Sequence, residues 1–227
     1  MKRIILLLLA IGTFTTSSAF AGVISSDIEK SNTYLEEARI MIRKGDLKNA
    51  EKQLNEALKL NKENADIYYE FGELEHSKGN TDKTIDYFTK AIQINPNRED
   101  FYLSRAVEEG QKLQLKAVIE DINKALELNP KCGQAYAILG ALYARYGHHQ
   151  EALEYINNAM KYDETMFDML YPARAEVKVS LRDYDGAIAD YNNAIKVVKQ
   201  ANNPKTAQKI EYFKQRIFEL QEAKKAF

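Results

Sequence analysis

The stretch KALELNP at residues 124–130 repeats a phrase that stands 34 residues earlier, KAIQINP at 90–96. Both phrases place Lys-Ala before an alternation of apolar and polar residues, and both end in Asn-Pro. The alanine recurs at steps of 34 residues and finally of 35, as Ala57, Ala91, Ala125, Ala159 and Ala194. A fixed period of this length indicates an array of repeated structural units. The longer last step places one inserted residue between the fourth and fifth units, within 160–171.

Other residues recur with the same period and predict that each unit is a pair of helices. A large apolar residue precedes each alanine by three positions: Leu54, Phe88, Ile122, Ile156 and Tyr191. In the first half of each unit, a tyrosine is followed four residues later by a small residue: Ala38, Gly72, Ala106, Gly140 or Ala175. Apolar residues at steps of three and four form one helix face, and the Gly-containing turns return the chain antiparallel. The small residue lets the two helices approach closely, and successive pairs stack because one pair cannot bury its apolar face alone.

At these residues the chain resembles the tetratricopeptide repeat family, whose pattern is W-x2-L-G-x2-Y, then A-x3-F, then P. The fourth unit matches through Tyr136, Leu139, Gly140, Tyr143, Ala152 and Ile156. Two units depart from the pattern: the third has Arg105 at the Leu place and Leu113 at the turn glycine, and the fifth has Arg174 at the Leu place and no closing Pro. The resemblance implies an all-α, right-handed α-solenoid of about five helix-turn-helix repeats. We expect these repeats at 31–64, 65–98, 99–132, 133–166 and 168–201.

The two ends of the chain differ from the repeats. Lys2 and Arg3, the apolar run at 4–11 and the small-x-small site at 19–21 predict a cleavable signal peptide over 1–21. An uncleaved anchor is the alternative, but the apolar run is too short to span a bilayer. We therefore expect an exported protein, in a bacterial periplasm or secreted beyond the cell, with an N-terminal tail over 22–30.

The segment 204–227 has no partner helix, and Ile210, Phe213, Ile217 and Leu220 form one stripe along it. The stripe predicts a capping helix that covers the last repeat, because the terminal repeats of an array need a polar outer face. A coiled-coil-like seam between two copies is the alternative.

The composition argues against several classes of function. Lys and Arg number 32 against 33 Asp and Glu, so no global field favours nucleic acid. The chain has one cysteine and three histidines, without the spacing of a zinc site, and no phosphate-binding or nucleophile motif. We expect no catalytic, cofactor-binding or metal-binding residues, and no enzyme activity.

The resemblance implies that the first helix of each repeat lines a concave groove. In the repeat register, the partner-binding residues of this groove are Leu35, Arg39, Ile42, Tyr69, Glu73, His76, Leu103, Val107, Ala141 and Arg145. This mixture of apolar residues and charges of both signs suits an extended peptide or an amphipathic helix. The carboxylate clamp of the chaperone-binding members is absent, because its places hold Leu35, Arg39, Glu70, Asp100 and Ser104.

These features predict a non-catalytic adaptor or scaffold that binds a protein or peptide partner in the bacterial cell envelope. They predict no nucleic-acid partner and no membrane span in the mature chain. The alternative is a self-assembling structural factor, a homo-oligomer that associates through its C-terminal helix or the ends of the array.

Overall fold

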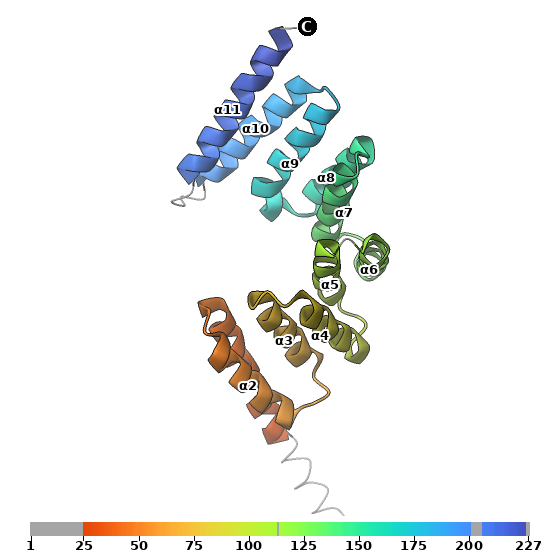
Figure 1. The fold of residues 1–227 in the computed structure, drawn as a ribbon, viewed down its shortest axis with the longest axis vertical. Coiled ribbons are helices and arrows are strands. Elements are labelled where there is room, and N and C mark those ends of the chain that lie inside the picture. The colour runs from red at the N-terminus through yellow and green to blue at the C-terminus, as the bar shows by residue number, and fades with distance from the viewer. Residues whose placement is uncertain (1–24, 113, 201–205, 226–227) are drawn as a thin grey trace, which may run out of the picture. The chain divides into compact units, whose positions relative to one another are not determined.

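The computed structural model describes residues 25–112, 114–200 and 206–225, and every regular element in these ranges is a helix (Figure 1). A helix over 25–44 is followed by α2 (Leu47–Leu60), α3 (Ala65–Ser77), α4 (Thr81–Ile94), α5 (Glu99–Gln111), α6 (Leu115–Leu128), α7 (Gly133–Arg145), α8 (His149–Tyr162), the short 3-10 helix η1 (Glu164–Met166), α9 (Phe167–Ser180), α10 (Tyr184–Gln200) and α11 (Thr206–Lys225). The predicted all-α solenoid of helix-turn-helix repeats with a further C-terminal helix is confirmed.

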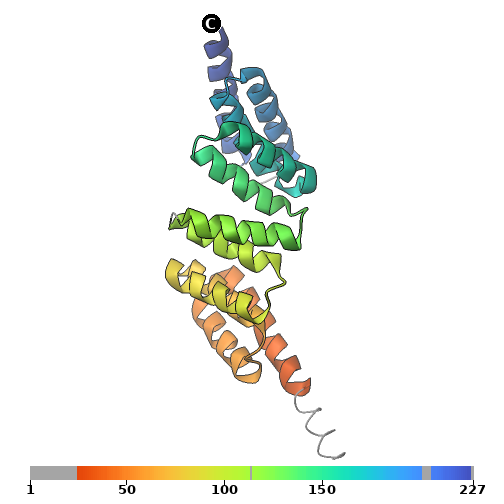
Figure 2. The ribbon, with the colours of Figure 1, turned by 90° about the vertical axis from the view of Figure 1, so that its right-hand side faces the viewer.

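The chain divides into two compact units after Lys112. The first unit contains the helix over 25–44 and α2 to α5, and the second contains α6 to α11. The third predicted repeat, 99–132, is therefore shared, with α5 in one unit and α6 in the other. Figure 2 shows from a second direction how paired helices turn back through short loops within each unit.

The repeated phrase KAIQINP is the junction between one helix pair and the next. The backbone N–H of Asn95 donates to the carbonyl of Ala91 at 2.9 Å and ends α4, while the Asn95 side chain accepts from the N–H of Asn97 at 3.2 Å. The hydroxyl of Tyr102, in the following helix, donates to the carbonyl of Pro96 at 3.1 Å. The second copy of the phrase makes the same three bonds through Asn129, Lys131, Tyr136 and Pro130. The sequence motif thus fixes where one helix stops and how the next one starts.

The fifth pair lacks this junction, and its second helix is longer. α10 has 17 residues, whereas α4, α6 and α8 have 14 each. The inserted residue lies between the fourth and fifth repeats, where η1 precedes an α9 of 14 residues in place of the 13 in α7. The insertion is accommodated at the start of the first helix, so the close packing of α9 with α10 is kept.

The core of each unit is built from the recurring positions. The five recurring alanines, Ala57, Ala91, Ala125, Ala159 and Ala194, are fully buried, and the large residues three positions earlier are buried with them. A Cβ atom added to Gly72 would overlap the ring of Phe88, and one added to Gly140 would lie 2.6 Å from Cγ1 of Ile156. The predicted close approach of the paired helices therefore requires a small residue at these places.

The turns within the helix pairs use the left-handed backbone region. Gly45, Gly79 and Gly147 have φ of 77°, 77° and 81°, which glycine adopts without a steric cost. The fifth repeat makes the same turn with Arg182 at φ 62°, so glycine is favoured at this place but not required. Leu113, which stands at the glycine place of the third repeat, lies outside the described residues.

The fifth repeat compensates for its departure from the family pattern with a buried ion pair. Arg174, at the place of the usual Leu, donates to both carboxylate oxygens of Asp190 on α10 at 2.8 and 2.6 Å. Lys178 lies 2.8 Å from the same carboxylate, whose residue is 2% exposed. Asp190 raises the pKa of the Arg174 guanidinium, since the bidentate contact favours the charged form.

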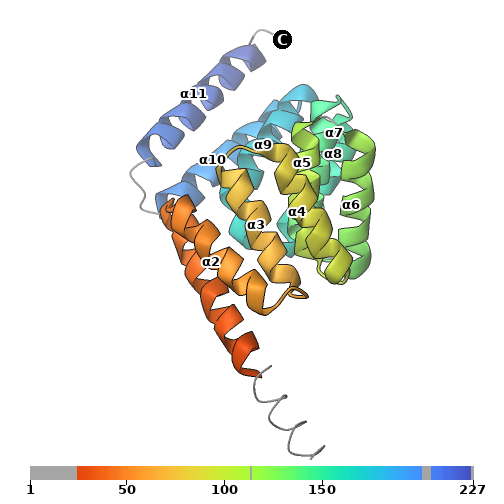
Figure 3. The ribbon, with the colours of Figure 1, turned by 60° about the horizontal axis from the view of Figure 1, so that its bottom comes forward.

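The C-terminal helix α11 packs along α10 (Figure 3). Phe213 and Leu220 are buried in one cluster with Tyr191 and Val198, and Ile210 and Ile217 pack against its edge. The predicted apolar stripe therefore covers the fifth repeat, which leaves it unavailable as a seam between two copies.

Among the helices of the described residues, none is both long and apolar enough to cross a bilayer. The predicted signal peptide, 1–21, lies outside the described residues, and so does the start of the 22–30 tail. The first described helix begins at residue 25, within that tail.

We predict that Gly72→Ala lowers the free energy of unfolding by about 1–3 kcal/mol, because the added methyl group overlaps the buried ring of Phe88. Alanine is the better helix former by about 1 kcal/mol, so helix propensity alone predicts the opposite sign. In a Phe88→Leu background the cost should shrink, because in the first repeat Ala38 and the smaller Leu54, at the equivalent places, are buried in one cluster. Urea unfolding of the single and double variants measures these free energies. A Gly72→Ala chain that is more stable than the parent would contradict the predicted overlap with the Phe88 ring.

We also predict that Asp190→Asn lowers the free energy of unfolding by about 3 kcal/mol, because two half-buried cations lose their shared carboxylate. Asp185→Asn is the matched control on the same helix, since Asp185 is exposed and pairs with Lys224 at the surface. Its cost should stay below about 1 kcal/mol. Equal losses for the two variants in urea unfolding would show that the buried ion pair contributes no more to stability than the surface pair.

Candidate functional site

The predicted groove residues of the first unit lie on three successive first helices, the helix over 25–44, α3 and α5. Two of them are core residues: Leu35 is 4% exposed and Leu103 is 3% exposed. Leu35 belongs to the hydrophobic cluster that contains Ala57 and Ile67. Both leucines therefore lie inside the fold and not on the surface predicted for them, because their apolar side chains gain more from packing than from facing solvent.

The remaining predicted residues of this unit retain some exposure: Arg39, Ile42, Tyr69, Glu73, His76 and Val107. Ala141 and Arg145 are exposed on α7, which belongs to the second unit. The predicted set is therefore divided, and its larger part belongs to the first unit.

Arginine–carboxylate contacts connect the three helices of the first unit. Arg39 donates through Nε to Glu70 at 2.7 Å and lies 4.0 Å from Asp66. Asp66 in turn accepts from Arg98 at 3.1 Å, and Arg98 also forms a two-bond fork with Asp100. Burial raises the pKa of Glu70 in spite of its bond to Arg39. These contacts hold the carboxylates of Asp66 and Glu70 on α3 and of Asp100 on α5.

Tyr69 on α3 stands among aromatic rings. Its ring stacks on Phe88 and Phe101 at centroid distances of 5.2 and 5.1 Å. Its hydroxyl lies 3.0 Å from the hydroxyl of Ser104 on α5. Burial raises the pKa of Tyr69, so the hydroxyl stays protonated at neutral pH and can donate a hydrogen bond.

The far end of α3 places one imidazole between two carboxyl groups. Nδ1 of His76 lies 2.7 Å from Oε1 of Glu108, a residue of which 3% is exposed. Burial raises the pKa of Glu73, and the nearby Glu108 raises it further, whereas Tyr69 and His76 favour its ionised form. Glu73 therefore carries a desolvation cost for which the surrounding side chains compensate only in part.

We call Asp66, Glu70, Glu73, Asp100 and Glu108 the acidic face of the first unit. Its five carboxyl groups contact or surround two guanidinium groups, those of Arg39 and Arg98, and one imidazole. The arrangement has an excess of negative charge. A cationic group from outside could meet it at Asp66, Glu73 and Asp100, because Glu70 and Glu108 are buried.

Sequence reasoning missed Arg98, which contacts two members of the acidic face. Arg98 precedes α5 and so has no place in the helical register, although its guanidinium also lies 4.6 Å from the ring centroid of Phe101. It missed a cavity of the second unit as well, which is lined by residues of α6, α7 and α8. Within the described ranges, no group of three or more His, Cys, Asp or Glu side chains is placed to hold a metal ion.

A family model described as a tetratricopeptide repeat matches residues 35–99, which include α2, α3 and α4. In this stretch the chain is similar to tetratricopeptide repeats. The helix pairs of the other described residues repeat the same architecture with the same buried positions. Among curated proteins, none matches this chain in sequence.

Solved structures of similar fold include three proteins of low sequence identity. PilF of Pseudomonas aeruginosa has a TM-score of 0.70 and 13% identity, over 89% of this chain and all of its own. TTC0263, a thermophilic TPR protein of Thermus thermophilus, has a TM-score of 0.64 and 17% identity, over 83% of this chain and 99% of its own. YrrB, described as a TPR protein with an unusual peptide-binding site, has a TM-score of 0.56 and 21% identity, over 84% of this chain and 96% of its own. These similarities show the fold of the array.

We predict that Glu73→Gln raises the free energy of unfolding at pH 7, with a gain that shrinks as the pH falls to about 4, near the ordinary pKa of Glu. Because burial raises the pKa of Glu73 in the folded chain, folding favours the protonated form, and stability is lost as the pH rises through the folded pKa. Urea unfolding at both pH values measures the difference. A Glu73→Gln chain that is less stable than the parent at pH 7 would contradict this reading of the acidic face.

Proposed function

We propose that the chain is a non-catalytic adaptor that binds a basic segment of a protein partner on the acidic face of its first unit. The observation that carries the proposal is the excess of carboxyl groups, with Glu73 partly buried and without an arginine or lysine partner among its described contacts. A lysine or arginine from a partner would supply the positive charge that Glu73 lacks within the described part of the chain. The same excess would repel the phosphates of a nucleic acid.

Apolar contacts on the same helices extend this surface. Tyr69 and Ile42 are half-buried, and Val107 is 43% exposed. A side chain that packs on these residues while a neighbouring lysine or arginine meets Glu73 would be part of an extended peptide or of an amphipathic helix. The proposed partner segment therefore combines basic and apolar residues.

The family and the first residues of the chain support the wider proposal. Tetratricopeptide arrays offer surfaces for protein partners, and YrrB, which is similar in fold, is described as having a peptide-binding site. The features of residues 1–21 that are typical of a signal peptide favour a place in the bacterial cell envelope.

Self-assembly is the second candidate, and one observation favours it. Tyr212 and Phe218 on α11 are each more than half exposed, whereas the stripe of the same helix is buried. Large exposed apolar side chains on a terminal helix can serve contacts between copies.

The test is a peptide-display selection on the purified full chain. We expect enriched sequences with lysine or arginine next to an apolar residue, and an affinity that falls about tenfold in Glu73→Gln, the effect of one charge-assisted hydrogen bond. Glu56→Gln, the same change on α2, the second helix of the first pair, is the control and should leave affinity unchanged.

Enrichment of acidic peptides, or equal effects of Glu73→Gln and Glu56→Gln, would overturn the proposal. A selection without any enriched sequence, together with concentration-dependent association of the chain in sedimentation, would favour self-assembly as the function.

A further inference from the structure

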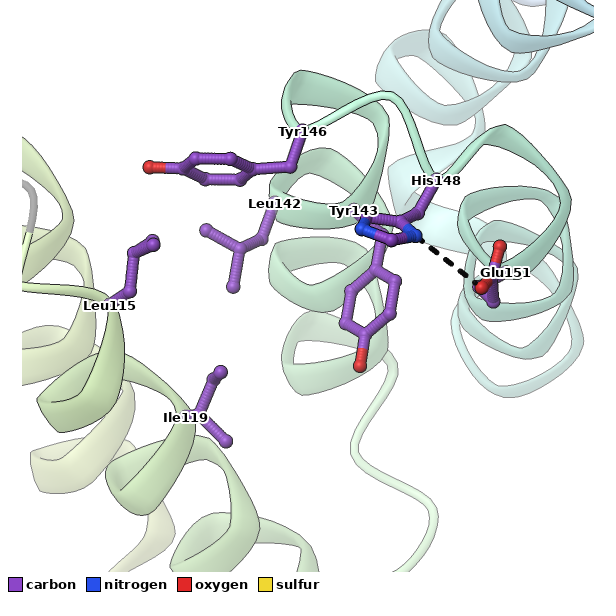
Figure 4. A pocket seen from close by; sticks show the side chains of 7 residues that line it. All are labelled: Leu115, Ile119, Leu142, Tyr143, Tyr146, His148 and Glu151. Carbon is purple, nitrogen blue, oxygen red and sulfur yellow. Dashed lines mark ion pairs between the residues drawn. The ribbon is translucent and has the colours of Figure 1, made fainter.

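The second unit contains a cavity of about 480 Å³ between α6, α7 and α8 (Figure 4). Its lining residues are Leu115, Ile119, Leu142, Tyr143, Tyr146, His148 and Glu151. The aliphatic side chains and the two tyrosine rings form most of the wall, and Nδ1 of His148 lies 3.5 Å from Oε1 of Glu151. The volume lies within the range of roughly 300–1,000 Å³ that is typical of ligand pockets. Among these lining residues there is one carboxylate and neither lysine nor arginine.

The equivalent junction of the first unit contains ion pairs instead. There, Nζ of Lys78 on the turn after α3 lies 2.8 Å from Glu51 on α2 and 2.9 Å from Glu75. The Glu75 carboxylate also accepts from Asn80 at 2.7 Å, and Nζ of Lys83 lies 3.9 Å away. Charged and polar side chains thus bridge the helices at this junction.

The cavity residues occupy the same places in the repeat, two periods of 34 residues later. Ile119 corresponds to Glu51, Tyr143 to Glu75, Tyr146 to Lys78, His148 to Asn80 and Glu151 to Lys83. On the same helix framework, three charged residues have been exchanged for apolar or aromatic ones, and a lysine for a glutamate. The cavity is therefore a local departure from the repeat and not a feature that every junction shares.

These exchanges leave apolar surface in contact with water. Ile119 is 38% exposed and Tyr146 is 46% exposed, and both side chains border the cavity. Apolar surface of this kind gains free energy when a ligand covers it. Because the ion-paired junction of the first unit satisfies the same fold, the fold does not require an apolar lining here.

We propose that this cavity is a second binding site, which takes an aromatic or large aliphatic side chain of a partner peptide that lies next to a lysine or arginine. Charge complementarity specifies the cation. The exchange of Lys83 for Glu151 reverses the charge at one place of the lining, and the Glu151 side chain is about half exposed beside the apolar wall. The inference rests on the proposed function only in taking a protein segment as the ligand, because the site lies in the other unit and uses no residue of the acidic face.

The test uses a fluorescent reporter in the full chain. Since the chain contains no tryptophan, Tyr146→Trp introduces a single reporter in the cavity wall. The probe is a short synthetic peptide with adjacent phenylalanine and lysine between glycine and serine residues. Two matched peptides replace the phenylalanine by serine or the lysine by glutamate.

We expect a saturable change of reporter fluorescence with the first peptide and an affinity at least about tenfold lower for both matched peptides, as expected for the loss of one charge-assisted contact or one buried anchor. In the reporter background, Glu151→Lys should reverse the preference between lysine and glutamate, and Ile119→Ser should weaken binding of every peptide that carries phenylalanine. Glu127→Lys, an equal charge reversal at an exposed place on α6, should change nothing. Far-UV circular dichroism checks that each variant keeps its helices.

Absence of saturable binding at millimolar peptide, or equal affinity for the lysine and glutamate peptides, would overturn the inference. Glu73→Gln separates the two proposals, since it should leave the reporter titration unchanged while it lowers the affinity of peptides selected on the acidic face.

Discussion

The structure depends on one close approach within each helix pair. A small residue on the first helix faces a large apolar residue on the second, as Gly72 faces Phe88 and Gly140 faces Ile156. This contact sets the separation of the two helices, so that the buried alanine of the second helix can pack as well. The Asn-Pro junction then fixes where the next pair begins. Stacking follows because each pair leaves an apolar face that only a neighbouring pair or a terminal helix can cover.

A framework fixed by so few positions leaves the other positions free to differ, and the two units use this freedom in opposite ways. In the first, Glu51, Lys78 and Glu75 bridge neighbouring helices. In the second, the equivalent places hold apolar and aromatic residues, and a cavity results. Burial disfavours the ionised form of Glu73, and Ile119 leaves apolar surface in contact with water. Both arrangements lower the stability of the folded chain. Such residues are the ones for which binding offers an explanation.

The 34-residue period was sufficient to predict the helix pairs and their core, and the apolar stripe over 210–220 was sufficient to predict the cap, since these depend on the spacing of apolar residues. Neither was sufficient for the site. The register placed Leu35 and Leu103 in a groove, but their side chains pack into the core. Arg98 precedes α5, so the groove positions, which were taken from the helices alone, did not include it. Arg174 was visible as a departure from the family pattern, but its partner Asp190 became evident only when α9 and α10 were brought together. The cavity likewise depends on three helices at once.

The net charge of the chain does not indicate which partners the local contacts would select. With 32 basic and 33 acidic residues, the chain has almost no overall charge to attract a partner from a distance. Discrimination must then come from short-range contacts, in which a partly desolvated carboxylate such as Glu73 accepts a cation and rejects an anion. The same argument applies to Glu151 beside an apolar wall. In both units, the proposed recognition needs a basic residue and an apolar residue together, because the charge alone would be screened by salt and the apolar contact alone would not distinguish partners.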